Sequence, residues 1–375
     1  MVQKTVLLVE PRKHQIAPMS LMKFSTWYKR KGYRVVLVTD IAYFHIPKKV
    51  DEIVVTSVFT FDIDKVISCI KYYKNHYGLN NEDVHVGGIA VSLMPEYIRE
   101  HCGNVDIHVG LHPEVENLPL DYSLYPEIDY SLAYTSRGCV RKCPWCMVPV
   151  IEGKMSYVHD WEGFINMHKP RVQFFDNNFT ACKKDWIEHV CKRLKYLDKW
   201  VDFNQSLDIR LFKEFHAKWL SQIKMECLRF SYDSTKTLDD QTVIDKVNLA
   251  KSYGFRDIRF DVLYNYDDTP EDFYHRLDVI NSLDCKAFPM KYVPLNQTNR
   301  HYVGEHWTQN RLDAFNKLMQ TGFSQGMLGN GKNSRNTFFK TFGKSGKEFV
   351  KNLDIMFIDK YGHIDDNQMT FEKFM

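Results

Sequence analysis

Three cysteines lie close together near the middle of the chain. Cys139, Cys143 and Cys146 are separated by three and by two residues, in a segment that also holds Gly138 and Pro144. Neither glycine nor proline suits a helix interior, so this segment is predicted to be a loop. A loop can wrap three thiolates around one soft metal centre, and thiolates select zinc or iron–sulfur clusters. Three ligands on a four-iron cluster would leave one iron open to substrate.

The spacing resembles that of the radical S-adenosylmethionine (radical SAM) superfamily, Cys-x3-Cys-x-aromatic-Cys, with Trp145 as the aromatic residue. The resemblance implies that the three cysteines hold a 4Fe–4S cluster whose open iron chelates S-adenosylmethionine (SAM). It further implies reductive cleavage of SAM to a 5′-deoxyadenosyl radical that abstracts hydrogen from a substrate. The alternative is a zinc site built on Cys143 and Cys146. That site would need a fourth ligand, and the other six cysteines are scattered singly.

Composition sets broad limits on the class of protein. A chain of 375 residues is expected to hold two domains, or one large domain with an appendage. The net charge of +3 is too small to argue for a polyanionic partner. Nine cysteines without regular pairing fit a reducing compartment. The N-terminus lacks the pattern of a signal peptide, and no run approaches the ~18 apolar residues of a membrane span, so a cytoplasmic protein is expected.

The first ~120 residues alternate apolar β-runs with helical stretches, the pattern of a parallel sheet covered by helices. The expected strands are Thr5–Val9, Arg34–Thr39, Glu52–Ser57, Val84–Val86 and Val105–Val109, and the expected helices are Met19–Lys31, Asp62–Tyr77 and Pro95–His101. Gly87 and Gly88 follow the fourth run, where the loop is expected to approach a ligand closely. The sequence therefore predicts a Rossmann-like domain over residues 1–125.

This segment resembles the cobalamin-binding domain that precedes the radical core in one radical SAM class. The resemblance lies in Val86-Gly87-Gly88-Ile89, Met94-Pro95-Glu96, Asp106–Gly110 with Glu114, and Leu118–Tyr122. The chain departs from the pattern at Ala90–Leu93, and it lacks an Asp-x-His-x-x-Gly motif to ligate cobalt. Two hypotheses follow: the domain binds cobalamin through a cradle that includes Gly87 and Gly88, or it is a scaffold without a cofactor.

From ~130 to ~295, further apolar runs alternate with helices. These runs are Tyr130–Tyr134, Val172–Phe175, Val201–Asn204, Cys227–Tyr232, Ile258–Tyr264 and Phe288–Val293. Thr269-Pro270-Glu271-Asp272 predicts a helix start, and Gly254 predicts a helix stop. The α/β pattern predicts a partial (β/α)6 TIM-type barrel over 126–297. The cysteine loop follows its first strand, at the carboxyl-terminal rim where such barrels place their chemistry.

The resemblance assigns further residues at the rim to SAM. Asp176 and Asn177 would accept from the methionine ammonium, or else belong to a polar loop that caps the next helix. Arg210 would bind a carboxylate, or form an ion pair with Asp208. Asp233 and Ser234 resemble the segment that contacts the ribose, although the family usually has Glu there.

Four residues further along the rim complete the assignments. The run Asp261–Glu271 resembles the family's segment beside the adenine, but its two middle acids are given another role. Asp267 and Asp268 are expected to cap the helix that follows them. Lys291 or Tyr292 would face the substrate.

Residues 298–375 are predicted to form a C-terminal cap, with a helix over Thr308–Gln320. Between Phe323 and Lys347 the chain alternates basic residues with aromatics and contains no acid. Such a stretch can bind single-stranded nucleic acid, or it is a solvated face over a small apolar cluster, which is the favoured interpretation. Gly326–Asn333 resembles a phosphate loop but lacks its terminal Ser or Thr and a preceding strand.

The prediction is therefore a radical SAM enzyme. With cobalamin it would be a methyltransferase acting on an unactivated carbon, and without cobalamin a hydrogen-abstracting oxidoreductase or mutase. It would take a small-molecule or nucleotide substrate and receive electrons from a reductant such as flavodoxin or ferredoxin. Two alternatives stay open. One is a radical SAM enzyme that modifies tRNA, and the other is a non-enzymatic zinc protein that binds nucleic acid.

Overall fold

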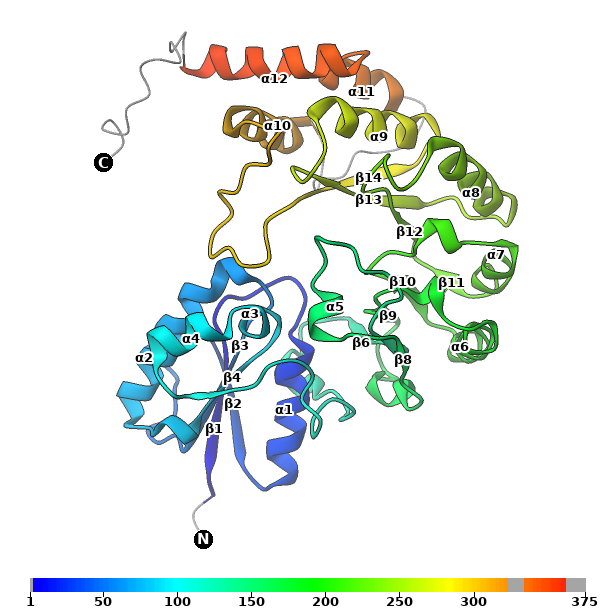
Figure 1. Ribbon diagram of the computed structural model, residues 1–375. Coiled ribbons are helices and arrows are strands. Elements are labelled where there is room, and N and C mark those ends of the chain that lie inside the picture. Colours follow the sequence, from blue (N-terminus) through cyan, green and yellow to red (C-terminus); the bar gives the residue numbers. More distant parts are fainter. Residues whose placement is uncertain (1–2, 323–333, 362–375) are drawn as a thin grey trace. The chain divides into compact units, whose positions relative to one another are not determined.

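A computed structural model describes residues 3–322 and 334–361 of the chain (Figure 1). It divides into two compact units. The first runs up to Gln205 and adds the segments Gln222–Met225 and Pro294–His301. The second holds Ser206–Ser221, Glu226–Val293 and the chain from Tyr302 on. The domain boundaries predicted from the sequence were drawn from its motifs and do not coincide with this division into compact units. They therefore stay predictions.

The first unit opens with a parallel sheet in the order β2-β1-β3-β4-β5. Its strands are β1 (Thr5–Glu10), β2 (Arg34–Thr39), β3 (Glu52–Thr56), β4 (Val84–Gly87) and β5 (Asp106–Ile107). Every residue of β1 is buried, which explains why this strand reads as an unbroken apolar run. The predicted strands are confirmed, and β5 is shorter than expected.

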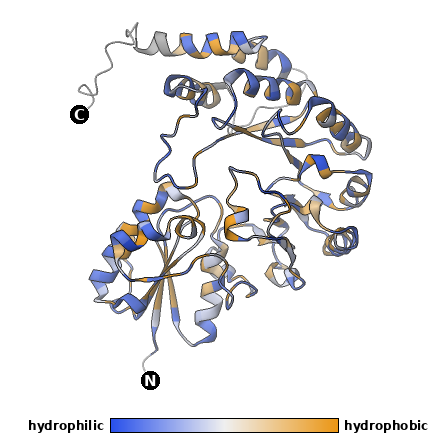
Figure 2. Cartoon of the chain, in the orientation of Figure 1, coloured by the Kyte–Doolittle hydropathy of each residue, from blue (hydrophilic) through white to orange (hydrophobic). Residues whose placement is uncertain are grey.

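Helices cover both faces of this sheet. On one face α1 (Met19–Arg30) packs Leu21 and Tyr28 against Val6 and Leu8. The opposite face carries α2 (Ile63–Tyr77), α3 (Ile89–Leu93) and α4 (Pro95–Cys102) over a larger apolar cluster. In Figure 2 these helices alternate hydrophobic and hydrophilic residues, as expected for elements with one buried face.

A second parallel sheet in the first unit has the order β11-β10-β9-β6. Its strands are β6 (Tyr130–Ala133), β9 (Arg171–Phe174), β10 (Trp200–Phe203) and β11 (Lys224–Met225), and α6 (Lys184–Leu197) connects β9 to β10. The first three match the predicted strands to within a residue or two. The short strand β11 was missed by sequence analysis, because two residues carry no readable pattern.

The second unit contains the parallel sheet β12-β13-β14. Its elements are α7 (Glu214–Leu220), β12 (Leu228–Ser231), α8 (Asp240–Ser252), β13 (Ile258–Tyr264), α9 (Pro270–Ser282) and β14 (Lys286–Lys291). Helix α9 starts as predicted, because Thr269 and Asp272 form a capping box with Pro270 at the first helical position. Gly254, at φ +92°, follows the end of α8, which confirms the predicted stop.

Three helices form the C-terminal part of this unit: α10 (Gln309–Gly322), α11 (Ser334–Phe342) and α12 (Gly346–Tyr361). Phe338, Phe342 and Phe349 are buried and pack against one another. Two of the three aromatic residues of α11, Phe338 and Phe342, therefore belong to a core, which supports the solvated-face interpretation. The phosphate-loop-like Gly326–Asn333 lies outside the described residues.

Short 3₁₀ segments complete the described elements: η1 (Thr60–Asp62), η2 (Asn81–Asp83), η3 (Tyr122–Leu124), η4 (Trp161–Phe164), η5 (Phe179–Ala181) and η6 (Ile209–Leu211). Within the part of the chain that the structure describes, no helix is both long enough and apolar enough to cross a membrane.

Candidate functional site

The cysteine loop is held at both ends by a small hairpin that follows β6. Strands β7 (Ser136–Arg137) and β8 (Ser156–Tyr157) pair antiparallel and bracket the loop. Inside it, the backbone N–H of Cys146 donates to Cys143 O over 3.0 Å, which closes a turn at Pro144-Trp145. The short helix α5 (Val148–Ile151) starts two residues after the last cysteine. The predicted loop, placed after the first barrel strand, is confirmed.

Gly138 is required at the start of this loop. It adopts φ +73°, and a Cβ there would lie 2.4 Å from Lys154 O. Its N–H donates to Glu152 Oε2 over 2.8 Å. Both the backbone conformation and the close approach to the returning chain exclude a side chain at this position.

The three cysteines of the loop are half-buried, whereas Cys69, Cys182, Cys191, Cys227 and Cys285 are buried. Burial raises the pKa of the Cys146 thiol, and the neighbouring Cys143 and Cys139 raise it further. The three sulfurs are thus close enough to influence one another. Among the described residues, no group of three or more His, Cys, Asp or Glu side chains is arranged to hold a metal ion. Three soft donors on one loop nevertheless fit the chemistry of an iron–sulfur cluster.

Glu152, which the sequence analysis missed, ties this loop to its surroundings. Its Oε2 also accepts from Asn177 Nδ2 over 2.6 Å, and its Oε1 lies 3.3 Å from Arg137 Nη1. Arg137 in turn lies 3.2 Å from Glu116 Oε1. One nearly buried carboxylate therefore joins the loop, the segment after β9 and the chain that leaves the first sheet.

The same chain of charges continues into α1 through Lys23. Lys23 is 3% exposed, its Nζ lies 3.2 Å from Glu116 Oε2, and it donates to the Tyr134 hydroxyl. Tyr134 donates to Glu116 Oε1 over 2.6 Å. Burial lowers the pKa of Lys23 to about 8, although Glu116 opposes the shift. In the alternation Lys23, Glu116, Arg137, Glu152, each charge lies beside an opposite one.

Asp176 lies beneath the loop and not in contact with solvent. It is 2% exposed, and burial raises its pKa. Its carboxylate accepts from Thr135 N over 2.9 Å, from Thr135 Oγ1 over 2.6 Å and from Ser136 Oγ over 2.6 Å. These contacts fix the backbone that enters the cysteine loop. They engage both carboxylate oxygens of Asp176, and the predicted contact with the methionine ammonium stays a prediction.

Asn178, two residues further, was not singled out from the sequence. It is 3% exposed, and its Nδ2 donates to Cys139 Sγ over 3.7 Å. Asn177 between them is half-buried, as is Trp145. A polar segment directly after a barrel strand indicates a functional segment. The sequence does not show which of its amides contacts the sulfur, because that depends on the local backbone conformation.

In the second unit, Arg210 forms the ion pair that was the alternative prediction. Its Nε lies 2.7 Å and its Nη2 3.1 Å from the Asp208 carboxylate. Asp233 is half-buried, and burial raises its pKa to about 6 while the charge of Arg276 opposes the shift. The Ser234 hydroxyl accepts from Lys236 N over 3.2 Å.

Arg276, a further residue missed from sequence, organises this rim. It is fully buried and donates to Tyr232 O over 3.2 Å, Asp233 O over 2.6 Å and Leu263 O over 2.7 Å. It also forms an ion pair with Asp268. The prediction that Asp267 and Asp268 cap α9 was therefore wrong. Asp268 compensates Arg276, Asp267 pairs with Lys236 at 2.7 Å, and Thr269 is the cap.

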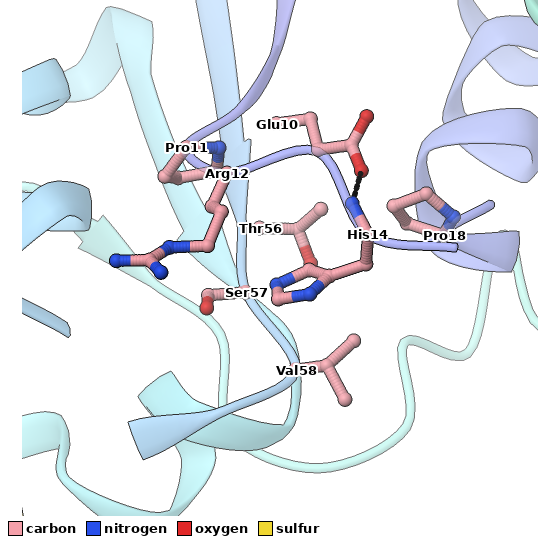
Figure 3. A pocket seen from close by; sticks show the side chains of 8 residues that line it. All are labelled: Glu10, Pro11, Arg12, His14, Pro18, Thr56, Ser57 and Val58. Atoms are coloured by element: carbon pink, nitrogen blue, oxygen red, sulfur yellow. Dashed lines mark hydrogen bonds between the residues drawn. The ribbon is translucent and has the colours of Figure 1, made fainter. Parts of the chain in front are cut away.

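A small pocket lies at the carboxyl ends of β1 and β3 (Figure 3). From these neighbouring strands the chain proceeds in opposite directions along the sheet, the position where open α/β sheets bind ligands. It is lined by Glu10, Pro11, Arg12, His14, Pro18, Thr56, Ser57 and Val58. The buried Asp62 lies 2.7 Å from Arg12 Nε and 3.0 Å from His14 Nε2. Sequence analysis assigned none of the lining residues to a binding site.

Gly88 packs directly against this pocket's wall. It has φ +95°, and a Cβ there would lie 2.4 Å from Thr56 Oγ1 and 2.6 Å from Ser57 O. At Gly87 the nearest atom to a Cβ would be His108 O, at an ordinary 3.6 Å. The packing of the protein therefore leaves no room for a Cβ at Gly88, whereas it would accommodate one at Gly87.

Gly88→Ala is expected to lower the free energy of unfolding by about 1–3 kcal/mol, because it combines a left-handed backbone with a clash against β3. Gly87→Ala is the matched control and is expected to stay within about 0.5 kcal/mol. Thermal unfolding midpoints of the two variants measure the difference. Equal midpoints would contradict the packing role of Gly88.

Comparisons with known proteins bear on this arrangement. No protein-family model matches the chain. A radical SAM methyltransferase from Kitasatospora setae, TsrM, solved with cobalamin and a 4Fe–4S cluster, is similar in structure with TM-score 0.58 and 15% identity. The similarity covers 87% of this chain and 77% of that one. The chain therefore shares the fold of that enzyme. The predicted α/β fold class is thereby confirmed.

Two curated proteins are related in sequence. An uncharacterised methyltransferase of Pyrococcus horikoshii is 24% identical over 189 residues, 46% of this chain and 41% of that protein. A tRNA-2-methylthio-N6-dimethylallyladenosine synthase of a Hydrogenobaculum species is 23% identical over 269 residues, 64% of this chain and 58% of that protein. The chain spans about half the length of the curated relatives it matches.

Proposed function

We propose that this chain is a radical SAM enzyme that binds a 4Fe–4S cluster through Cys139, Cys143 and Cys146 and uses cobalamin to methylate a small-molecule substrate. The observation that carries the proposal is the cysteine loop itself. It follows the first barrel strand, and the β7–β8 hairpin and Glu152 fix its two ends. The TsrM-like fold and the two related proteins support the same class.

When bound, the cluster supplies an electron that cleaves SAM to a 5′-deoxyadenosyl radical, and cobalamin carries a methyl group. The chain's own residues hold and orient these groups. Glu152 fixes Asn177, which offers its amide to the methionine part of SAM. The assignment of Asp233 and Ser234 to the ribose rests on the sequence resemblance. Arg276 fixes the backbone carbonyl of Asp233.

The pocket between β1 and β3 is the proposed contact with cobalamin. It offers the donors Arg12, His14 and Ser57 beside the apolar Pro18 and Val58. Its volume of about 10 Å³ admits a single small polar group at the edge of the cofactor and not the ring system. Without cobalamin, the same domain would act as a scaffold, and the enzyme would be a hydrogen-abstracting oxidoreductase or mutase.

Anaerobic reconstitution followed by incubation with SAM and a strong reductant tests the proposal. We expect 5′-deoxyadenosine from cleavage and a shifted corrin spectrum on titration with hydroxocobalamin. A protein with a full iron complement that forms no product from SAM would overturn it. Cleavage of SAM without any corrin binding would exclude methylation and leave the hydrogen-abstracting enzyme.

Neither alternative finds comparable support. The tRNA methylthiotransferases carry a second cluster on three further cysteines. Of the two cysteines before Cys139 in this sequence, Cys69 and Cys102, the first is fully buried. The zinc protein would bind nucleic acid through residues 323–347, whose aromatic side chains in α11 include the buried Phe338 and Phe342. A small-molecule substrate and a flavodoxin or ferredoxin as reductant complete the proposal.

A further inference from the structure

We infer that Asn178 sets the reduction potential of the metal centre by donating a hydrogen bond to the sulfur of Cys139. The inference rests on the proposed function, because it assumes that Cys139 ligates a 4Fe–4S cluster. Asn178 is a positioning and tuning residue and not a ligand. Neither the cysteine spacing nor any of the comparisons assigns it a role.

The orientation of the Asn178 amide follows from its two partners. Thr180 Oγ1 donates to Asn178 Oδ1 over 3.0 Å, which leaves the NH2 group to face Cys139 Sγ at 3.7 Å. A thiolate is an acceptor only, so the opposite amide orientation would place two acceptors against each other. Both Asn178 and Thr180 are buried, at 3% and 4% exposure, so water competes little with these bonds.

A second donor reaches the same sulfur. The backbone N–H of Arg141 donates to Cys139 Sγ over 3.3 Å. Backbone donors belong to the loop itself and persist in any variant, whereas the Asn178 bond comes from a different strand–loop segment. Asn178 is therefore the side chain through which the segment after β9 acts on the sulfur of Cys139.

Hydrogen bonds to cluster sulfurs are among the factors that set reduction potentials. Reduction adds an electron to a centre that already carries negative thiolates, and an N–H donor stabilises the more negative state more strongly. The Asn178 amide should therefore raise the potential and make the cluster easier to reduce. Since Asn177 contacts Glu152 and not the sulfur, neighbouring amides of one segment have separate tasks.

The test is an EPR-monitored redox titration of the reconstituted full chain without SAM. Asn178→Ala and Asn178→Leu, the latter of similar shape but without a donor, are expected to bind a full cluster with a more negative midpoint. Asn177→Ala is the matched control and should keep the wild-type midpoint. In protein labelled with 15N-asparagine, pulsed EPR of the reduced cluster should show a 15N coupling that Asn178→Ala abolishes and Asn177→Ala retains.

The outcomes separate this inference from the proposed function. A full cluster whose midpoint and 15N coupling are the same in wild type and both Asn178 variants would overturn the inference alone. Failure of the wild-type chain to assemble any iron–sulfur cluster would overturn the proposed function and the inference together.

Discussion

Cys143→Ala is expected to abolish the iron–sulfur chromophore and all SAM cleavage. The wild-type chain should assemble about four irons on three thiolates, and loss of one of three ligands leaves a second iron without a protein ligand. Cys139→Ala and Cys146→Ala should behave alike. Iron and sulfide analysis with the visible spectrum, after anaerobic reconstitution, measures the loss.

Cys102→Ala serves as the control for that experiment. Cys102 is half-buried like the loop cysteines but lies at the end of α4. Its replacement should leave both the iron content and the chromophore unchanged. A wild-type chain that takes up zinc and stays colourless would rule out the iron–sulfur assignment and return the loop to the zinc alternative.

Arg276→Met is expected to destabilise the second unit by about 3–5 kcal/mol. The substitution keeps an apolar stem but leaves the Asp268 carboxylate uncompensated, and the carbonyls of Tyr232, Asp233 and Leu263 lose their shared donor. Calorimetric unfolding of the full chain should show a markedly lower midpoint for the transition of this unit. Adding Asp268→Leu should recover part of the loss, because the unpaired charge is then gone.

The matched control is Arg311→Met, which breaks another Arg–Asp pair of the same unit. Arg311 Nε lies 2.8 Å from Asp354, with the two side chains 27% and 47% exposed. A solvent-accessible pair contributes at most about 1 kcal/mol. An equal loss of stability in the two arginine variants would contradict the claim that burial makes the Arg276 ion pair the stronger contribution.

The strands could be predicted from sequence because parallel strands buried on both faces are continuous apolar runs. Glu52–Thr56, for example, ends one residue before its predicted limit. The β7–β8 hairpin could not be predicted, since two-residue strands show no periodicity. Yet this hairpin is what pins the cysteine loop.

Within the candidate site, the cysteines proposed to hold the cluster could be identified from the sequence, and their polar partners could not. The pattern Asp176-Asn177-Asn178 predicted a functional segment. It did not predict that Asp176 contacts Thr135 and Asn178 contacts Cys139, because the direction of each side chain depends on the backbone conformation. Lys23 and Arg276 read as ordinary charged residues of amphipathic helices. Their burial depends on partners far along the chain, a relation that local sequence does not encode.

The alternating charges of Lys23, Glu116, Arg137 and Glu152 couple the N-terminal sheet to the cysteine loop. The Lys23–Tyr134 contact joins residues 111 positions apart, so it closes a long stretch of chain. Glu116 is the carboxylate that Lys23 and Arg137 share, and it thereby joins α1 to the hairpin that brackets the cysteines. A change that loosens α1 from the first sheet is therefore expected to loosen the cysteine loop as well.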